Sequence, residues 1–128
     1  MALCDPATQA AFHAFMLDRP AVWKATTGLT HWPRFLQLVR NHGGVEAARL
    51  LVHQVGLTEG FLRLKSAGRL DLTVEFEMLQ VRFECCFTAE ERGLARRQLV
   101  ENGMPRMHIP LEPDCAGVPS SGVAPRRV

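Results

Sequence analysis

Apolar residues recur every three to four positions, the spacing of a helix face, over most of the first hundred positions of the chain. Asp5 followed by Pro6 is a typical helix start, because a capping carboxylate precedes a proline at the first helical position. The apolar residues that follow recur on one helix face: Phe12, Phe15 and Met16. Pro20 has no amide donor, so we expect the first helix to be broken there.

The pattern then predicts two helices joined by a tight glycine turn. Thr30 is the expected cap of the first of them, with Pro33 tolerated in its first turn. This helix should end at His42, because Gly43 and Gly44 readily adopt positive φ. The segment 45–53 should form the next helix, which has apolar residues on its inward face.

A fourth, short helix is expected between Thr58, as its cap, and Gly68, as its stop. The stretch 70–78 is ambiguous, because its apolar residues alternate with polar ones at the two-residue period of a strand. No second strand is apparent to pair with it, and Thr73 is equally suited to cap a helix. The pattern leaves both readings open.

The segment Thr88-Ala89-Glu90-Glu91 is a capping box, in which the threonine hydroxyl and the Glu91 carboxylate each accept a backbone N–H. The helix that it opens should end at Asn102-Gly103. Prolines, glycines and serines dominate from Met104 onward, which is typical of an extended tail. We therefore expect an all-α protein, with a compact bundle of about five to six short helices over residues 1–103 and a disordered proline-rich tail over residues 104–128.

Composition places the chain among ordinary globular proteins. The hydrophobic share is 47%, the charged share is 22% and the formal net charge is +2, so the overall field is too weak to indicate a polyanionic partner. No apolar run approaches the roughly 20 residues of a membrane span, and the start of the chain does not resemble a secretory signal. We expect a cytoplasmic protein that has no membrane partner.

The cysteines do not have the spacing of a four-ligand zinc site. Reduced thiols are therefore expected, and packing in the core explains the adjacent pair Cys85 and Cys86 better than a redox role.

Several separated blocks of the sequence resemble a widespread family of small bacterial helical proteins and modules that have no assigned function. The blocks cover roughly residues 12–103, and they are RFLQ at 34–37, GGVEAARLL at 43–51, GF at 60–61, GRLDLTVE at 68–75 and FTAEE at 87–91. The resemblance implies helix rather than strand for residues 73–83. It names no activity.

Groups that catalysis requires do not converge in the sequence. The carboxylates of Asp71, Glu75 and Glu77 invite a metal hypothesis, but the favourable position of an acidic residue in the first turn of a helix is enough to explain Glu75. The histidines are scattered, and the paired glycines lack the lysine of a phosphate-binding loop. We therefore predict no catalytic residue, no cofactor and no metal.

Candidate contact residues lie around the paired helices, and they are Arg34, Arg40, Arg49, Trp23 and Trp32. These features favour a noncatalytic helical protein-interaction module, such as an accessory subunit of a larger bacterial assembly, with an unidentified protein partner. The alternative is a helix-turn-helix-like DNA-binding accessory protein, in which the arginines would contact phosphates. Glu46, at the start of the recognition helix in that arrangement, would repel phosphate.

Overall fold

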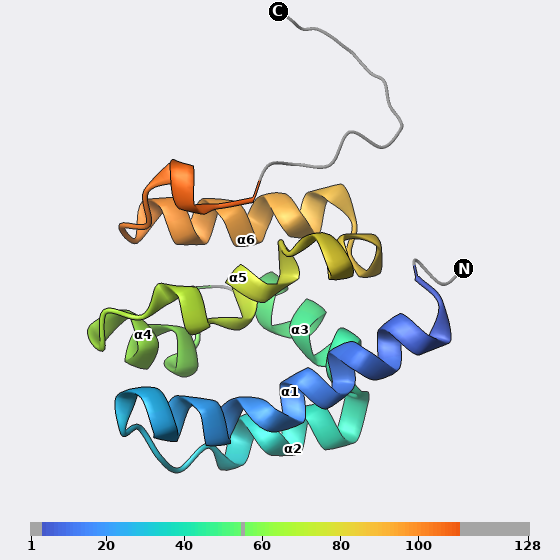
Figure 1. Cartoon of the computed structure of the whole chain (residues 1–128), viewed down its shortest axis with the longest axis horizontal. Helices are drawn as coiled ribbons and strands as arrows, with labels where there is room; N and C mark the ends of the chain where they lie inside the picture. The colour runs from blue at the N-terminus through green and yellow to red at the C-terminus, as the bar shows by residue number, and fades with distance from the viewer. Residues whose placement is uncertain (1–3, 55, 111–128) are drawn as a thin grey trace, which may run out of the picture.

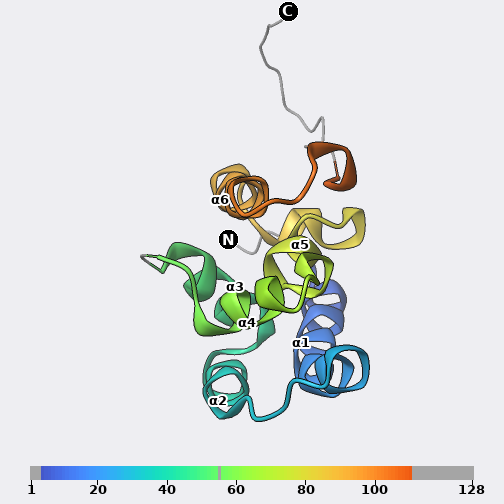
Figure 2. The same ribbon diagram turned by 90° about the vertical axis from the view of Figure 1, so that its left-hand side faces the viewer.

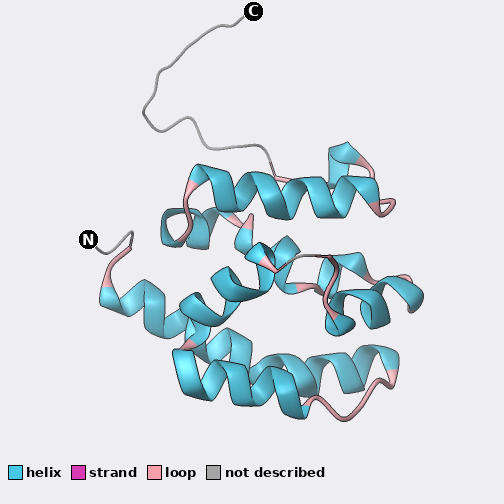
Figure 3. Cartoon of the chain, turned by 180° about the vertical axis from the view of Figure 1, so that it is seen from behind, coloured by secondary structure: helices cyan, strands magenta, loops and turns pink. Residues whose placement is uncertain are grey.

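The computed structural model describes residues 4–54 and 56–110, and these residues form helices and loops without a strand (Figure 3). The α-helices are α1 (Pro6–Thr27), α2 (Pro33–His42), α3 (Gly44–His53), α4 (Glu59–Ser66), α5 (Val74–Met78) and α6 (Ala89–Glu101). The 3-10 helices are η1 (Leu70–Leu72), η2 (Val81–Cys86) and η3 (Arg106–His108). The expected all-α fold is confirmed. No helix in this part of the chain is both long and apolar enough to cross a membrane.

Helix α3 lies at the centre of the bundle and packs against α1, α2, α5 and α6. The pair α1 and α2 forms one side of the molecule, and α6 forms the opposite side (Figures 1 and 2). Apolar residues from all six α-helices meet between these sides, among them Phe12, Val39, Ala48, Phe61, Met78 and Leu99. The segment from α4 to α5 lies between these two sides (Figures 1 and 2).

Helix α3 can approach α1 closely because its first residue is a glycine. A Cβ atom on Gly44 would lie 2.5 Å from the Cα atom of His13, which is too close for any side chain. The Gly44 amide donates to Nδ1 of His13 at 2.9 Å. Gly43 precedes it with a φ of 85°, so the tight turn needs one glycine for its backbone conformation and the other for its close contact.

Two expectations about the first connection are wrong. Helix α1 does not break at Pro20 but continues as one helix of 22 residues to Thr27. The proline removes only one amide donor from the helix. Met16 before it and Trp23 after it are 0% and 2% exposed, so packing in the core holds the helix in place on both sides of the proline. Helix α2 begins after Trp32 rather than after Thr30, with Pro33 at its first position.

The ambiguous segment 70–78 is helical. It forms η1 and α5, and the Thr73 hydroxyl caps α5 by accepting the amide of Phe76 at 3.2 Å. The two-residue alternation of apolar residues does not mark a strand here, since the chain passes from η1 to α5 at Thr73 and the buried residues, Thr73, Val74, Glu75 and Met78, do not follow that period.

The capping box at the start of α6 is confirmed and also connects α6 to α3. The Glu91 side chain is 3% exposed and accepts the Thr88 amide, while Glu91 Oε2 lies 2.8 Å from Nε of Arg49 and 3.0 Å from Nε2 of His53. Burial opposes ionisation of this carboxyl, but the Thr88 amide and the two side chains of α3 outweigh it and lower the pKa of Glu91.

The domain continues beyond the expected boundary at Gly103. Met104 and Ile109 are 9% and 7% exposed and belong to the hydrophobic core, and η3 lies between them. Arg96 donates to the carbonyl of Pro110, at the end of the described residues. The prolines in this segment therefore do not prevent packing. Residues 111–128 of the expected tail lie outside the described residues.

The expectation of reduced thiols is also wrong for two cysteines. Cys4 and Cys86 form a disulfide across 82 positions of sequence and tie the start of α1 to the end of η2. Cys85 is free and exposed, so it is not a packing residue. The neighbours Cys85 and Cys86 point to different environments because η2 turns between them.

Candidate functional site

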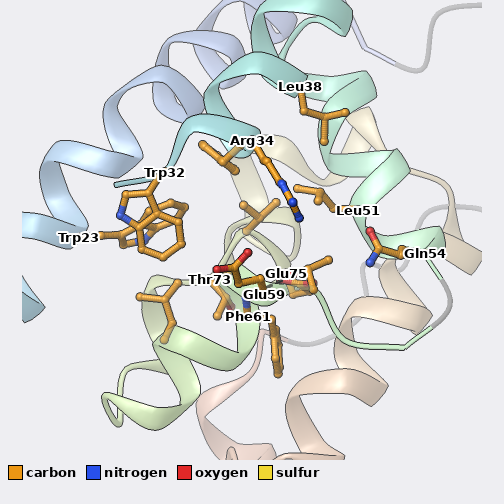
Figure 4. A pocket seen from close by; sticks show the side chains of 15 residues that line it. Trp23, Trp32, Arg34, Leu38, Leu51, Gln54, Glu59, Phe61, Thr73 and Glu75 are labelled. Atoms are coloured by element: carbon orange, nitrogen blue, oxygen red, sulfur yellow. Dashed lines mark hydrogen bonds between the residues drawn. The ribbon is translucent and has the colours of Figure 1, made fainter. Parts of the chain in front are cut away.

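A pocket of about 260 Å³ opens between α2, α3, α4 and the start of α5, and Trp23 near the end of α1 also lines it. Its walls are mainly apolar and aromatic, and its few polar groups are the side chains of Arg34, Gln54, Thr58, Glu59, Thr73 and Glu75. Figure 4 shows the two tryptophans on one side and Leu51 and Gln54 on the other, with Arg34, Glu59 and Glu75 between them. A mostly apolar pocket with few polar groups is the usual form of a binding site.

The aromatic wall is rigid because its indole groups are anchored. The ring centroids of Trp23 and Trp32 lie 4.3 Å apart, and the Phe35 ring lies 5.0 Å from that of Trp23. The Trp23 indole donates to the carbonyl of Leu72 at 2.8 Å, which connects α1 to η1. Both tryptophans line the pocket although they are less than a tenth exposed, so only small parts of their side chains border it.

The loop that carries Trp32 is held by α4. The Arg63 guanidinium lies 3.9 Å from the ring centroid of Trp32 and donates to the carbonyls of Thr30 and His31. His31 has a φ of 73°, a strained value for a residue with a side chain, and these bonds help to maintain it. Gly60 lets the indole lie directly on α4, since a Cβ atom there would be 3.2 Å from Trp32.

Glu75 is the unusual group of the pocket. It is 4% exposed, and its own backbone amide is the one donor to its carboxyl within the described residues. Burial without a partner raises the pKa of Glu75 to about 7, because the charged form loses its hydration. Its side chain lines the cavity, so a ligand in the pocket can reach the carboxyl.

The other charged groups of the pocket are exposed and balance each other. Arg34 from α2 and Glu59 from α4 both line the cavity, and no ion pair joins either of them to a described residue. The threonine hydroxyls are already engaged, since Thr58 caps α4 and Thr73 caps α5. When Glu75 is ionised, the pocket therefore carries one uncompensated negative charge.

The structure brings together three of the five contact residues that the sequence singled out. Trp23, Trp32 and Arg34 line the same pocket. Arg40 is exposed in the last turn of α2 and does not line it. Arg49 pairs with Glu91 and, at 3.6 Å, with Glu46, so its charge is used within the protein.

The three carboxylates of the metal hypothesis do not form one site. Asp71 pairs with Arg69 and Glu77 pairs with Arg82, whereas Glu75 lies in the pocket. A different group has metal-like spacing: the sulfur atoms of Cys4, Cys85 and Cys86 lie within 4.8 Å of one another. Two of those sulfurs are joined in the disulfide, which leaves one free thiol as a ligand.

In the sequence, Glu75 has the features of an ordinary carboxylate in the first turn of a helix. Its importance follows from burial, which depends on how α3, α4 and α5 come together, and no local signal separates it from Glu77. The cap at Thr73 was the available clue, because it places Glu75 in the first turn of a helix instead of on a strand.

Comparisons with protein-family profiles, with curated proteins and with solved structures give no significant match to this chain. The resemblance to a family of small bacterial helical proteins therefore stays a prediction.

Proposed function

We propose that the protein is a noncatalytic helical interaction module that binds another protein through the pocket between α2, α3, α4 and α5. The observation that carries this proposal is the aromatic wall of the pocket next to a buried carboxyl whose one donor among the described residues is its own backbone amide. A side chain from a protein partner would fill the apolar space and supply that carboxyl with a partner.

The lining residues favour binding over catalysis. They include no histidine, cysteine, serine or lysine, and the hydroxyl groups of both threonines are committed to helix caps. A nucleophile next to a general base, the usual requirement for covalent catalysis, is not present among them. One buried carboxyl beside apolar walls is enough for recognition but does not form an acid–base pair.

The alternative of a helix-turn-helix DNA reader has less support. A recognition helix needs outward side chains that reach base edges, but α3 buries Ala47, Ala48 and Val52 in the core. Its exposed positions are Glu46, Leu50 and His53. Arg49, which would contact a phosphate in this alternative, pairs with Glu91 instead.

Site-specific photocrosslinking in cells tests the proposal. A photoreactive amino acid at Gln54, on the rim of the pocket, should form a discrete crosslink to a protein, whereas the same group at the exposed Leu50 of α3 should not. Leu51→Phe should remove the Gln54 crosslink, because the larger ring occupies the cavity that Leu51 lines. Leu50→Phe is the matched control, with the same change one residue away and outside the pocket.

Equal crosslinks at both positions would contradict the proposal, since they would show contact that does not depend on the pocket. Persistence of the Gln54 crosslink in the Leu51→Phe protein would contradict it too.

A further inference from the structure

We propose that the pocket accepts the side chain of a lysine from the protein partner, with its ammonium group bound to the carboxylate of Glu75. This inference rests on the proposed function and names the chemistry of the group that enters the pocket.

The charges around the pocket favour a cation. Arg34 on α2 and Glu59 on α4 are the charged groups that face Glu75 across the pocket, and their charges cancel. The residues that α1 and α3 contribute to the lining are uncharged, namely Trp23 and Leu51. Glu75 is 4% exposed, and among the described residues its carboxyl has no partner apart from its own amide, so an incoming cation would meet an acceptor with free capacity.

The shape of the site favours lysine over arginine. Four methylene groups of a lysine stem can lie against Phe35, Leu51 and Phe61, which line the cavity, while the compact ammonium reaches the carboxylate. A guanidinium is a wide planar group, whereas an ammonium is a compact point charge, so the ammonium needs less room beside the buried carboxyl. The Trp23 indole, which donates to the Leu72 carbonyl, and the adjacent Trp32 ring form one wall of this cavity.

This binding chemistry predicts a characteristic pH dependence. The ammonium binds only the ionised carboxylate, and with a pKa of about 7 the ionised fraction of Glu75 rises from about a tenth at pH 6 to about nine tenths at pH 8. Lysine stays protonated over this range. The affinity should therefore increase about tenfold between pH 6 and pH 8. A ligand that accepts a hydrogen bond from the neutral acid would show the opposite slope.

The test uses the full chain and capped amino acids as probes. Nα-acetyl-lysine N-methylamide is titrated at pH 6, 7 and 8 and compared with the norleucine analogue, which has a similar stem without the charge, and with n-butylammonium. The readout is tryptophan fluorescence together with NMR shifts, because both tryptophans of the chain line the pocket. Glu75→Gln should remove lysine binding and its pH slope, whereas Glu101→Gln, at an exposed position outside the pocket, should retain both.

Lysine binding that exceeds norleucine binding and strengthens about tenfold toward pH 8 would support the inference. Equal binding of norleucine, a reversed slope or unchanged binding by Glu75→Gln would overturn it. Tighter binding of n-butylammonium than of the capped lysine would show a site for small free amines and would also overturn it. If the Gln54 crosslink to a protein forms while lysine fails to bind, the proposed function stands without this inference. Lysine binding without a crosslink would show that the pocket binds lysine but that no protein partner supplies it, which would contradict the proposed function.

Discussion

At the scale of the residue, Glu75 should weaken the fold as its carboxyl ionises. Its pKa is raised in the folded protein from an ordinary value of 4.5 to about 7, so the folded state binds the extra proton between these values. The stability that Glu75 contributes is therefore full below pH 4.5 and is lost as the pH rises toward 7. Between pH 5 and pH 8 this loss should amount to roughly 2–3 kcal/mol.

Glu75→Gln should remove most of that loss, because the amide does not ionise. Urea unfolding of the two proteins at pH 5 and pH 8 measures the effect, with Glu59→Gln as the exposed control. The same stability difference between Glu75→Gln and the natural chain at both pH values would contradict the raised pKa of Glu75.

The burial of Glu75 could not be predicted from the sequence, because Glu75 and Glu77 are alike in their local surroundings. Trp23, Trp32 and Arg34, in contrast, could be selected from the sequence as contact residues.

At the scale of the element, the disulfide should fasten the start of α1 to η2. Replacing Cys4 by serine should lower the free energy of unfolding by about 2–4 kcal/mol, because the link closes a long loop in the unfolded chain. Denaturant melts of the oxidised proteins measure this loss. Cys85→Ser is the matched control and should change stability little, since Cys85 is exposed and unbonded. Equal stability of the natural chain and Cys4→Ser would contradict a disulfide in the folded protein.

Elements with a local cap were predictable, and those set by distant contacts were not. Thr58 and Thr88 were identified correctly as caps, because the hydroxyl and the amide that it accepts lie three residues apart in sequence. The continuation of α1 through Pro20 and the pairing of Cys4 depend on residues far away in sequence, so local patterns could not reveal them.

At the scale of the whole molecule, the folded domain should extend to Pro110. A chain that ends at Pro110 should retain the stability of the full chain, whereas one that ends at Gly103 should lose several kcal/mol, because Met104 and Ile109 leave the core. Thermal or denaturant unfolding of the three lengths tests this. Equal stability of the two shortened chains would show that residues 104–110 contribute nothing to the core. The composition of this segment was misleading, since two apolar residues among prolines are enough to pack it.

Binding of a protein partner through the pocket is the central claim, and affinity measured with the partner identified by crosslinking tests it most directly. Titration of the purified partner into the full chain, followed by tryptophan fluorescence, should give at least about tenfold weaker binding for Leu51→Phe than for the natural chain, a loss of about 1.4 kcal/mol. Leu50→Phe should bind as the natural chain does, and unfolding melts should show that both variants are folded. Equal affinity of Leu51→Phe and Leu50→Phe would contradict the claim.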